Sequence, residues 1–234
     1  MSAGDGRQRL ERHFERELED LKNALTAMGT LVDAQLGQAC DALFGDRPEF
    51  VQGVIERDRE VDAFDTQIDK MCQRIFALTQ PVAIDLRLSM AGLQINGQLE
   101  RIGDIAVNLA ERVQPLTGYA PFLHTTRLEE MARIARIMVS DSLEAFMNSN
   151  AELALRVLAS DDVVDNLGRQ IFTTLVAAMR DDQSLIDPGA HMLILTHHIE
   201  RMADHATNIA EDVIFLVDAR LVKHNAEDLS RQVR

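Results

Sequence analysis

The sequence ERIGDIAVNLAE, from Glu100 to Glu111, returns one hundred residues later as ERMADHATNIAE, from Glu200 to Glu211. Seven of the twelve aligned positions are identical: Glu, Arg, Asp, Ala, Asn, Ala and Glu. The chain therefore contains an internal repeat, which indicates two copies of one structural unit.

The repeated sequence has the pattern of a helix with two opposed faces. Each residue turns by about 100° around a helix axis, so in both copies four oxygen-bearing side chains fall within an arc of roughly 80°. These residues are Glu100, Asp104, Asn108 and Glu111, and Glu200, Asp204, Asn208 and Glu211. An apolar stripe with spacings of three and four lies nearly opposite, which predicts a core-facing side and an outward acidic side. The stripe comprises Ile95, Leu99, Ile102, Ala106, Leu109 and Val113, and in the second copy Leu195, Ile199, Met202, Ala206, Ile209 and Val213.

The acidic side is the part that the two copies share. Surface substitutions usually cost little stability, so outward positions are expected to diverge first. Here the outward Glu, Asp, Asn and Glu are the same in both copies, whereas Ile102 of the apolar stripe corresponds to Met202. Packing does not explain this choice, and we infer that the acidic side binds something.

Composition excludes several classes of protein. The 234 residues are 46% hydrophobic but only 4% aromatic, with no tryptophan, which is typical of an all-α protein with a sizeable core. The net charge of −14 argues against binding to nucleic acid or anionic lipid and favours cations or basic protein surfaces. So few aromatic rings also leave no stacking platform for single-stranded nucleic acid.

Cysteine use and hydropathy predict a cytoplasmic protein. Cys40 and Cys72 are the only cysteines, and their spacing fits no metal motif, so we expect reduced core residues. The first residues are charged from Asp5 onward, and no apolar run approaches the roughly 18 residues of a membrane-spanning helix.

Apolar periodicity and turn residues predict six helices, over about residues 8–44, 49–78, 83–113, 127–147, 151–180 and 190–222. Asp187 is expected to cap the sixth helix, with Pro188 at its first position. The predicted fold is all-α, with two tandem three-helix bundles related by the internal repeat. Their predicted bounds are 8–113 and 127–222, with a linker at 114–126 and a polar tail at 223–234.

The second helix of each half carries a further pair of acids. Ala42–Asp62 aligns with Ala145–Asp165 at a constant offset of 103 residues. Asp58 and Asp62 thereby match Asp161 and Asp165, each pair one helical turn apart. This spacing suits extra ligands from a neighbouring helix, and it suits an exposed acidic shoulder equally well.

A metal site is the preferred interpretation of the repeated acids. A Glu and an Asp one turn apart can offer oxygens to a hard or borderline cation. A solvated acidic face is the usual alternative, but the shared register in both halves disfavours it. His197 lies on the same arc as Glu200, yet its counterpart is Gly97, so a packed or solvated histidine is the simpler expectation.

Signatures of catalysis are lacking, and we predict no catalytic residue. The sequence shows no phosphate-binding glycine loop, no Cys–His pairing and no nucleophile elbow. A ferritin-like oxidase would need Glu-x-x-His motifs that point into a bundle. Here the order is His197-x-x-Glu200, it occurs once, and the acids are expected to face outward.

On these residues the chain resembles the PhoU family, over about residues 10–222. Both repeated sequences, with their Glu-x-x-x-Asp followed by Asn and Glu, match the two signature stretches of that family. The resemblance implies a cytoplasmic, often dimeric, all-α regulator of phosphate transport. It also implies repression of the phosphate-starvation response through a sensor histidine kinase and the ATPase subunit of the phosphate ABC transporter.

The resemblance further implies bound metal, with iron, zinc, magnesium or manganese as candidates. The metal-binding residues of the family correspond to Glu100, Asp104, Glu200 and Asp204 in this sequence. The second-helix acids Asp58, Asp62, Asp161 and Asp165 are expected to be further ligands. Two alternatives stay open: a ferritin-like metal-binding or oxidase protein, and an accessory protein of a low-affinity phosphate carrier. The expected partners are proteins and a second copy of the chain, with no nucleic acid and no direct membrane contact.

Overall fold

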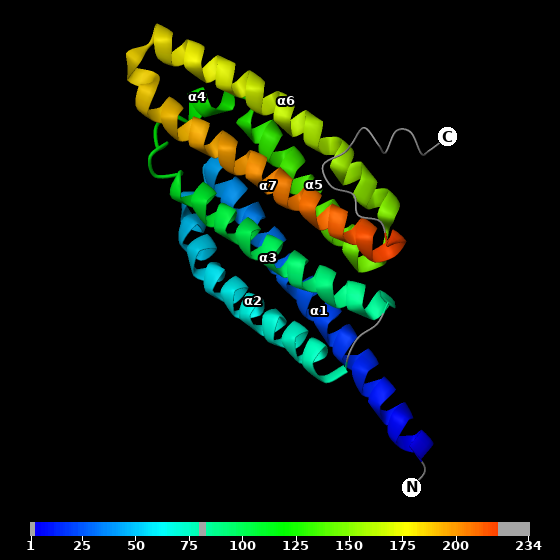
Figure 1. Ribbon diagram of the computed structural model, residues 1–234. Helices are drawn as coiled ribbons and strands as arrows, with labels where there is room; N and C mark the ends of the chain where they lie inside the picture. The colour runs from blue at the N-terminus through cyan, green and yellow to red at the C-terminus, as the bar shows by residue number, and fades with distance from the viewer. Residues whose placement is uncertain (1–2, 80–82, 220–234) are drawn as a thin grey trace, which may run out of the picture.

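The computed structural model describes residues 3–79 and 83–219, which fold into long helices joined by short turns (Figure 1). The long helices are α1 (Ala3–Phe44), α2 (Val51–Thr79), α3 (Ala83–Glu111), α5 (Leu128–Asn148), α6 (Ala151–Asp181) and α7 (Ile186–Asp218). Three short helices complete the order: η1 (Pro48–Phe50), α4 (Ala120–His124) and η2 (Gln183–Leu185). No strand occurs in the described ranges, so the predicted all-α class is confirmed.

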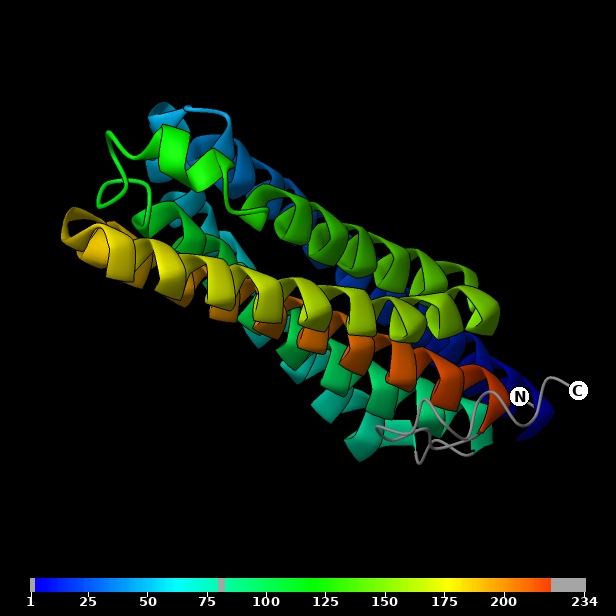
Figure 2. The same ribbon diagram turned by 90° about the horizontal axis from the view of Figure 1, so that it is seen from above.

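The helices form two layers (Figures 1 and 2). Four of them lie side by side in the order α2, α3, α7, α6, and α1 and α5 cover one side of this sheet of helices. The first unit is α1–α3 and the second is α5–α7, as the repeat predicts. The units meet where α3 packs against α7, and we call this contact the seam.

The two helices of the seam run antiparallel. Arg87 near the start of α3 donates from Nε to the carbonyl of Leu216 near the end of α7, at 3.4 Å. Arg112, which directly follows α3, lies 3.4 Å from Nδ1 of His191 near the start of α7. Equivalent helices of the two repeats are therefore related by an approximate twofold axis.

The expected apolar stripes form the centre of the core. The side chains of Ile95, Leu99, Ile102, Ala106 and Leu109 are fully buried, as are Leu195, Ile199, Met202, Ala206, Ile209 and Val213. Val113, at the end of the first stripe, is partly buried against this core. Burial of these long stripes stabilises helices whose individual residues have only modest helix propensity.

Turn chemistry fixes most helix ends. Asp46 has a φ of 52° between α1 and η1, and Pro48 opens η1 because the first turn of a helix needs no proline N–H. Ser149 ends α5 in the left-handed region, with a φ of 51°. Asn150 then caps α6, since its Oδ1 accepts a hydrogen bond from the backbone N–H of Leu153 at 3.1 Å.

The structure corrects two details of the sequence prediction. Helix α7 begins at Ile186, so Asp187 and Pro188 lie inside its first turn and Leu185 holds the N-cap position. Proline fits there because the first four N–H groups of a helix have no acceptor within the helix. The segment expected to be a plain linker contains α4, whose Leu123 packs into the core. Residues 220–222 of the sixth expected helix and the tail at 223–234 lie outside the described residues.

Neither cysteine is bonded in the described chain, and burial raises the pKa of both thiols to about 11. Both thiols therefore stay protonated and unreactive near neutral pH. Within the described residues, no helix combines the length and the apolar character that crossing a membrane requires.

Candidate metal centres

The acids of the first repeat gather in the groove between α2 and α3. Burial raises the pKa of the Glu100 carboxyl, and the nearby charges of Asp104, Asp65 and Asp62 raise it further. Burial likewise raises the pKa of Asp58, with added contributions from Asp62 and Asp104. Carboxylates that raise one another's pKa values repel in their charged forms. We call this group the first acidic cluster.

Two amide side chains hold this cluster in place. Asn96 of α3 donates from Nδ2 to Oδ1 of Asp65 at 2.7 Å and to Oδ1 of Asp69 at 3.2 Å. Gln35 of α1 donates from Nε2 to the carbonyl of Val54 at 3.0 Å and, more weakly, to Oδ1 of Asp58 at 3.4 Å. The remaining oxygens, Gln35 Oε1 and Asn96 Oδ1, are buried and have no hydrogen-bond partner in the described chain. The cluster therefore holds spare acceptors beside its carboxylates.

Asp65, Asp69, Asn96 and Gln35 are the residues that sequence reasoning missed. A signal for two of them was present, because Asp58, Asp62, Asp65 and Asp69 follow one another at spacings of four, three and four. This spacing places all four on one helix face. No local pattern pointed to Gln35, which reaches the cluster only through the packing of α1 on α2.

The second acidic cluster lies between α6 and α7. Burial raises the pKa of Glu200, and the charges of Asp165 and Asp204 add to this effect. The His197 ring lies 4.0 Å from the Glu200 carboxylate, and Arg169 lies 3.9 Å from that of Asp165. Asp161 stands one turn before Asp165 on α6 and is partly buried.

The second cluster is the smaller of the two. At the offset of the second helices, Asp65 corresponds to Gly168 and Asp69 to Phe172. A Cβ atom on Gly168 would overlap Oε1 of Glu200, so the glycine makes room for this carboxylate against α6. The first cluster thus has an extra pair of acids where the second has a glycine and an exposed phenylalanine.

The prediction that the acids form outward ridges is only partly correct. Asp62, Asp104, Asp165 and Asp204 are exposed, whereas Asp58, Glu100, Asp161 and Glu200 are partly buried. Each group is therefore partly enclosed between two helices and partly exposed. The repeated asparagines do not join the acids: Asn108 donates to the backbone carbonyl of Asp104 at 2.8 Å, and Asn208 donates to Gln98 across the seam at 3.3 Å.

The donor chemistry of both clusters fits an oxygen-preferring cation. The ligands on offer are carboxylates, joined in the first cluster by amide oxygens, and these are the groups that Mg²⁺ and Mn²⁺ prefer. Among the described residues, no three His, Cys, Asp or Glu side chains already converge on one point. A cation would therefore have to draw the repelling carboxylates together.

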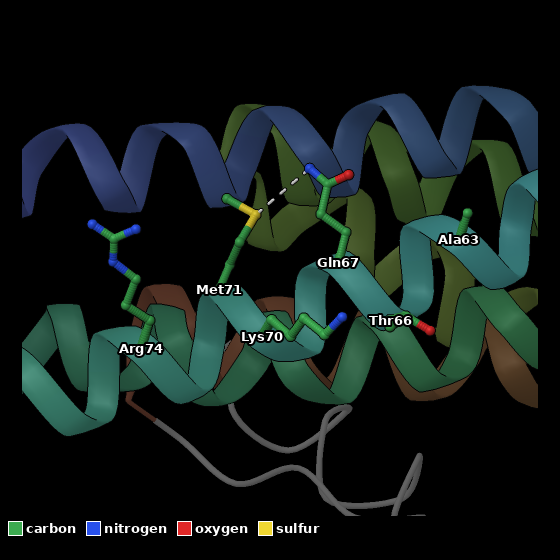
Figure 3. Close-up of a pocket in the computed structure, with 6 residues that line it drawn as sticks. All are labelled: Ala63, Thr66, Gln67, Lys70, Met71 and Arg74. Atoms are coloured by element: carbon green, nitrogen blue, oxygen red, sulfur yellow. Dashed lines mark hydrogen bonds between the residues drawn. The ribbon is translucent and has the colours of Figure 1, made fainter.

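The opposite flank of α2 carries a different surface feature (Figure 3). A hollow of about 350 Å³ is lined by Ala63, Thr66, Gln67, Lys70, Met71 and Arg74. Met71 and Gln67 point toward α1, and Arg74 pairs with Glu17 of α1 at 2.8 Å. No carboxylate is among these lining residues, and the hollow is separate from the acidic clusters.

Comparison with known sequences gives one family. The chain matches the PhoU domain twice, over residues 25–113 and 128–213. It is 34% identical over 200 residues to the "Phosphate-specific transport system accessory protein PhoU homolog" of Caulobacter vibrioides, covering 85% of this chain and 87% of the relative. The protein of the same description from Aquifex aeolicus is 36% identical over 209 residues, covering 89% and 95%.

Solved structures agree with this result. The crystal structure of PhoU from Pseudomonas aeruginosa superposes with a TM-score of 0.82 at 36% identity, covering 88% of this chain and 100% of that one. PhoU from Streptococcus pneumoniae, a phosphate transport system regulatory protein, gives the same TM-score at 28% identity, covering 90% and 99%. Both acidic clusters lie within the two matched segments.

Proposed function

Because this chain belongs to the PhoU family of phosphate transport accessory proteins, we propose that it is a cytoplasmic regulator of phosphate uptake and phosphate homeostasis. In this role it couples the ATPase subunit of the phosphate ABC transporter to a sensor histidine kinase and represses the phosphate-starvation response. The observation that carries the proposal is the match of both repeats to the PhoU domain, together with the similarity of most of the chain to relatives described as phosphate transport accessory proteins.

Metal binding is the second element of the proposal. Glu100, Asp104, Asp58 and Asp62 would hold cations in the first cluster, and Glu200, Asp204, Asp161 and Asp165 in the second. A bound cation would offset the repulsion that raises the pKa values of Asp58, Glu100 and Glu200. Oxygen ligands favour Mg²⁺ or Mn²⁺ over zinc and iron, although they accept all four.

The placement of the clusters supports a docking role. The first cluster lies between α2 and α3 and the second between α6 and α7, so the seam of α3 and α7 runs between them. One partner surface could therefore touch both clusters, and a twofold dimer of the chain could present four. A kinase or ATPase surface with basic residues would complement them.

A regulatory protein fits this geometry better than an enzyme does. Asp62, Asp104, Asp165 and Asp204 are exposed, and His197, which lies 4.0 Å from the Glu200 carboxylate, is itself exposed. A ferritin-like oxidase needs a shielded site in which reactive oxygen species are contained. The alternative, an accessory protein of a low-affinity phosphate carrier, would differ in the transporter that the chain binds.

The test is to delete the gene in its own host and to measure transcription of phosphate-starvation genes in phosphate-rich medium. We expect the deletion to switch these genes on and the wild-type gene to restore repression. Pull-down with the purified chain should recover the transporter ATPase and the kinase. Normal repression in the deletion strain would reject the regulatory role.

The metal element is tested separately with Asp104→Ala/Asp204→Ala. We expect this variant to lose stabilisation by manganese and to repress poorly, whereas Glu144→Gln on exposed α5 surface should behave as wild type. If the double variant represses normally and purified wild-type protein holds no metal, the proposal of metal binding is rejected, whereas the proposed regulatory role is unaffected.

A further inference from the structure

Two arginines and two histidines gather toward one end of the seam. Arg112 lies just after α3, and His191, His198 and Arg201 lie on the facing side of α7. We call these four residues the seam cluster. The charges of Arg112 and Arg201 both act on the His198 ring, so these side chains lie close together, although the chain as a whole carries a net charge of −14.

The seam cluster leaves two buried polar atoms unused. Nε of Arg112 and Nδ1 of His198 are both shielded from water and have no hydrogen-bond partner in the described chain. Within residues 3–79 and 83–219, the guanidinium makes one polar contact, the 3.4 Å approach of Nη1 to Nδ1 of His191. A buried N–H without an acceptor costs about 1–3 kcal/mol, and more when the group is charged.

Packing and helix capping do not account for this arrangement. Five arginines of the described ranges pair with a carboxylate within 4.0 Å, namely Arg47, Arg74, Arg127, Arg136 and Arg169. Arg112 has no such pair there and differs from the other unpaired arginines because its Nε is buried. The carbonyl end of α3 offsets part of its charge, but no carbonyl accepts from its Nε. Asp212 occupies the equivalent place in the second repeat, so the repeat itself does not require an arginine.

Two arginines also lie toward the middle of the seam. Arg101 and Arg201 are equivalent residues of the two repeats, and both act on His205. The ring is fixed by Gln98, whose Oε1 lies 2.8 Å from Nδ1. Arg101 and Arg201 thus place two further positive charges beside the seam.

We propose that the seam cluster binds an oxyanion. The planar guanidinium of Arg112 offers its free Nε–H, the imidazoles of His191 and His198 offer ring nitrogens, and Arg201 adds charge from the adjacent turn. Guanidinium groups bind carboxylate, sulfate and phosphate oxygens through the same fork of donors. The anion is either a free inorganic oxyanion or a carboxylate on a partner protein, since both present this chemistry.

The experiment uses the full chain freed of metal, so that an anion cannot bind through a cation on the acidic clusters. At constant ionic strength we would titrate sulfate, phosphate and acetate, and follow the NMR signals of the arginine Nε–H groups. We expect the Arg112 signal to move and saturate, while that of exposed Arg156 stays in place. Stronger binding of sulfate and phosphate identifies a free anion, and stronger binding of acetate identifies a partner carboxylate.

Variants provide the second readout, by calorimetric titration with the same anions. Arg112→Gln should abolish saturable binding, Arg112→Lys should weaken it at least tenfold by removing the fork, and Arg156→Gln should leave it unchanged. An unmoved Arg112 signal in the wild type, or equal binding by Arg112→Gln and Arg156→Gln, overturns the proposal. If Arg112→Gln does not fold, the wild-type NMR titration decides alone.

Discussion

The carboxylate of Glu200 lies against Gly168 of α6, in the space that a Cβ atom on residue 168 would need. Gly168→Ala should therefore push this carboxylate away from Asp165. We expect weaker manganese binding by the second cluster, measured by calorimetry in an Asp104→Ala background that leaves the second cluster intact.

Gly97→Ala is the matched control, because no atom lies within 4 Å of the added Cβ. It should raise the free energy of unfolding by up to about 1 kcal/mol through helix propensity and leave binding by the second cluster unchanged. Equal manganese affinity of the Gly168→Ala variant and its parent would show that Glu200 does not need this space.

The two acidic clusters should differ in how strongly they hold cations. The first contains Asp65 and Asp69 in addition to the acids that both clusters share, and Asn96 bonds to both. More carboxylates in one site raise its affinity for a divalent ion. We expect Asp104→Ala to reduce the manganese-induced rise in Tm more than Asp204→Ala does. The opposite order would place the dominant site in the second repeat.

Asp212 should make the stability of the protein depend on pH. Burial, and then the charge of Glu211, raise the pKa of its carboxyl from 3.8 to about 7. Between these values the folded chain holds a proton that the unfolded chain releases, so this contribution to stability falls as the pH rises and is lost above about pH 7. The cost of the charged form is up to about 4 kcal/mol.

Asp212→Asn removes this cost, so the variant should unfold at higher urea concentration than the wild type near pH 8, and the difference should vanish near pH 4. Exposed Asp218→Asn, six residues later on the same helix, is the control and should show no such trend. A pH-independent difference between Asp212→Asn and the wild type would mean that the carboxyl titrates normally.

Ile102 should be among the costliest positions to truncate. Its side chain is fully buried in α3, and Ile→Ala at such a site typically costs about 2–5 kcal/mol because a cavity is left behind. Ile137 on α5 is 45% exposed, so Ile137→Ala should change the unfolding free energy by less than about 0.5 kcal/mol. Chemical denaturation of both variants would check the contrast.

Most of the fold followed from the sequence because its helices are long and amphipathic. The apolar stripe around Ile102 and Met202 predicted the buried faces of α3 and α7, and the structure confirms them. Local signals were weaker at helix ends. Placing Pro188 at the first helical position predicted a start two residues too late, since proline is accepted throughout a first turn. Helix α4 is too short to show periodicity.

The candidate site was less accessible, because its members come from different helices. Glu100 and Asp104 stood out through the repeat, and Asp58 and Asp62 through the offset between halves. Gln35 reaches the first cluster only through tertiary packing, and Arg112 shows its lack of a partner only when α3 and α7 are placed together. Spacing along one helix carries no information on either contact.

The antiparallel seam has a consequence for the origin of the chain. A protein half as long, with one repeat, would leave the outer flank of its third helix bare, and a second identical molecule would cover it about a twofold axis. Gene fusion would then turn association between two molecules into folding of one. Once both copies lay in a single gene, they no longer had to be identical in sequence, and each could acquire its own chemistry. Equivalent positions of the two repeats illustrate this: Ile105 corresponds to His205, and Arg112 corresponds to Asp212.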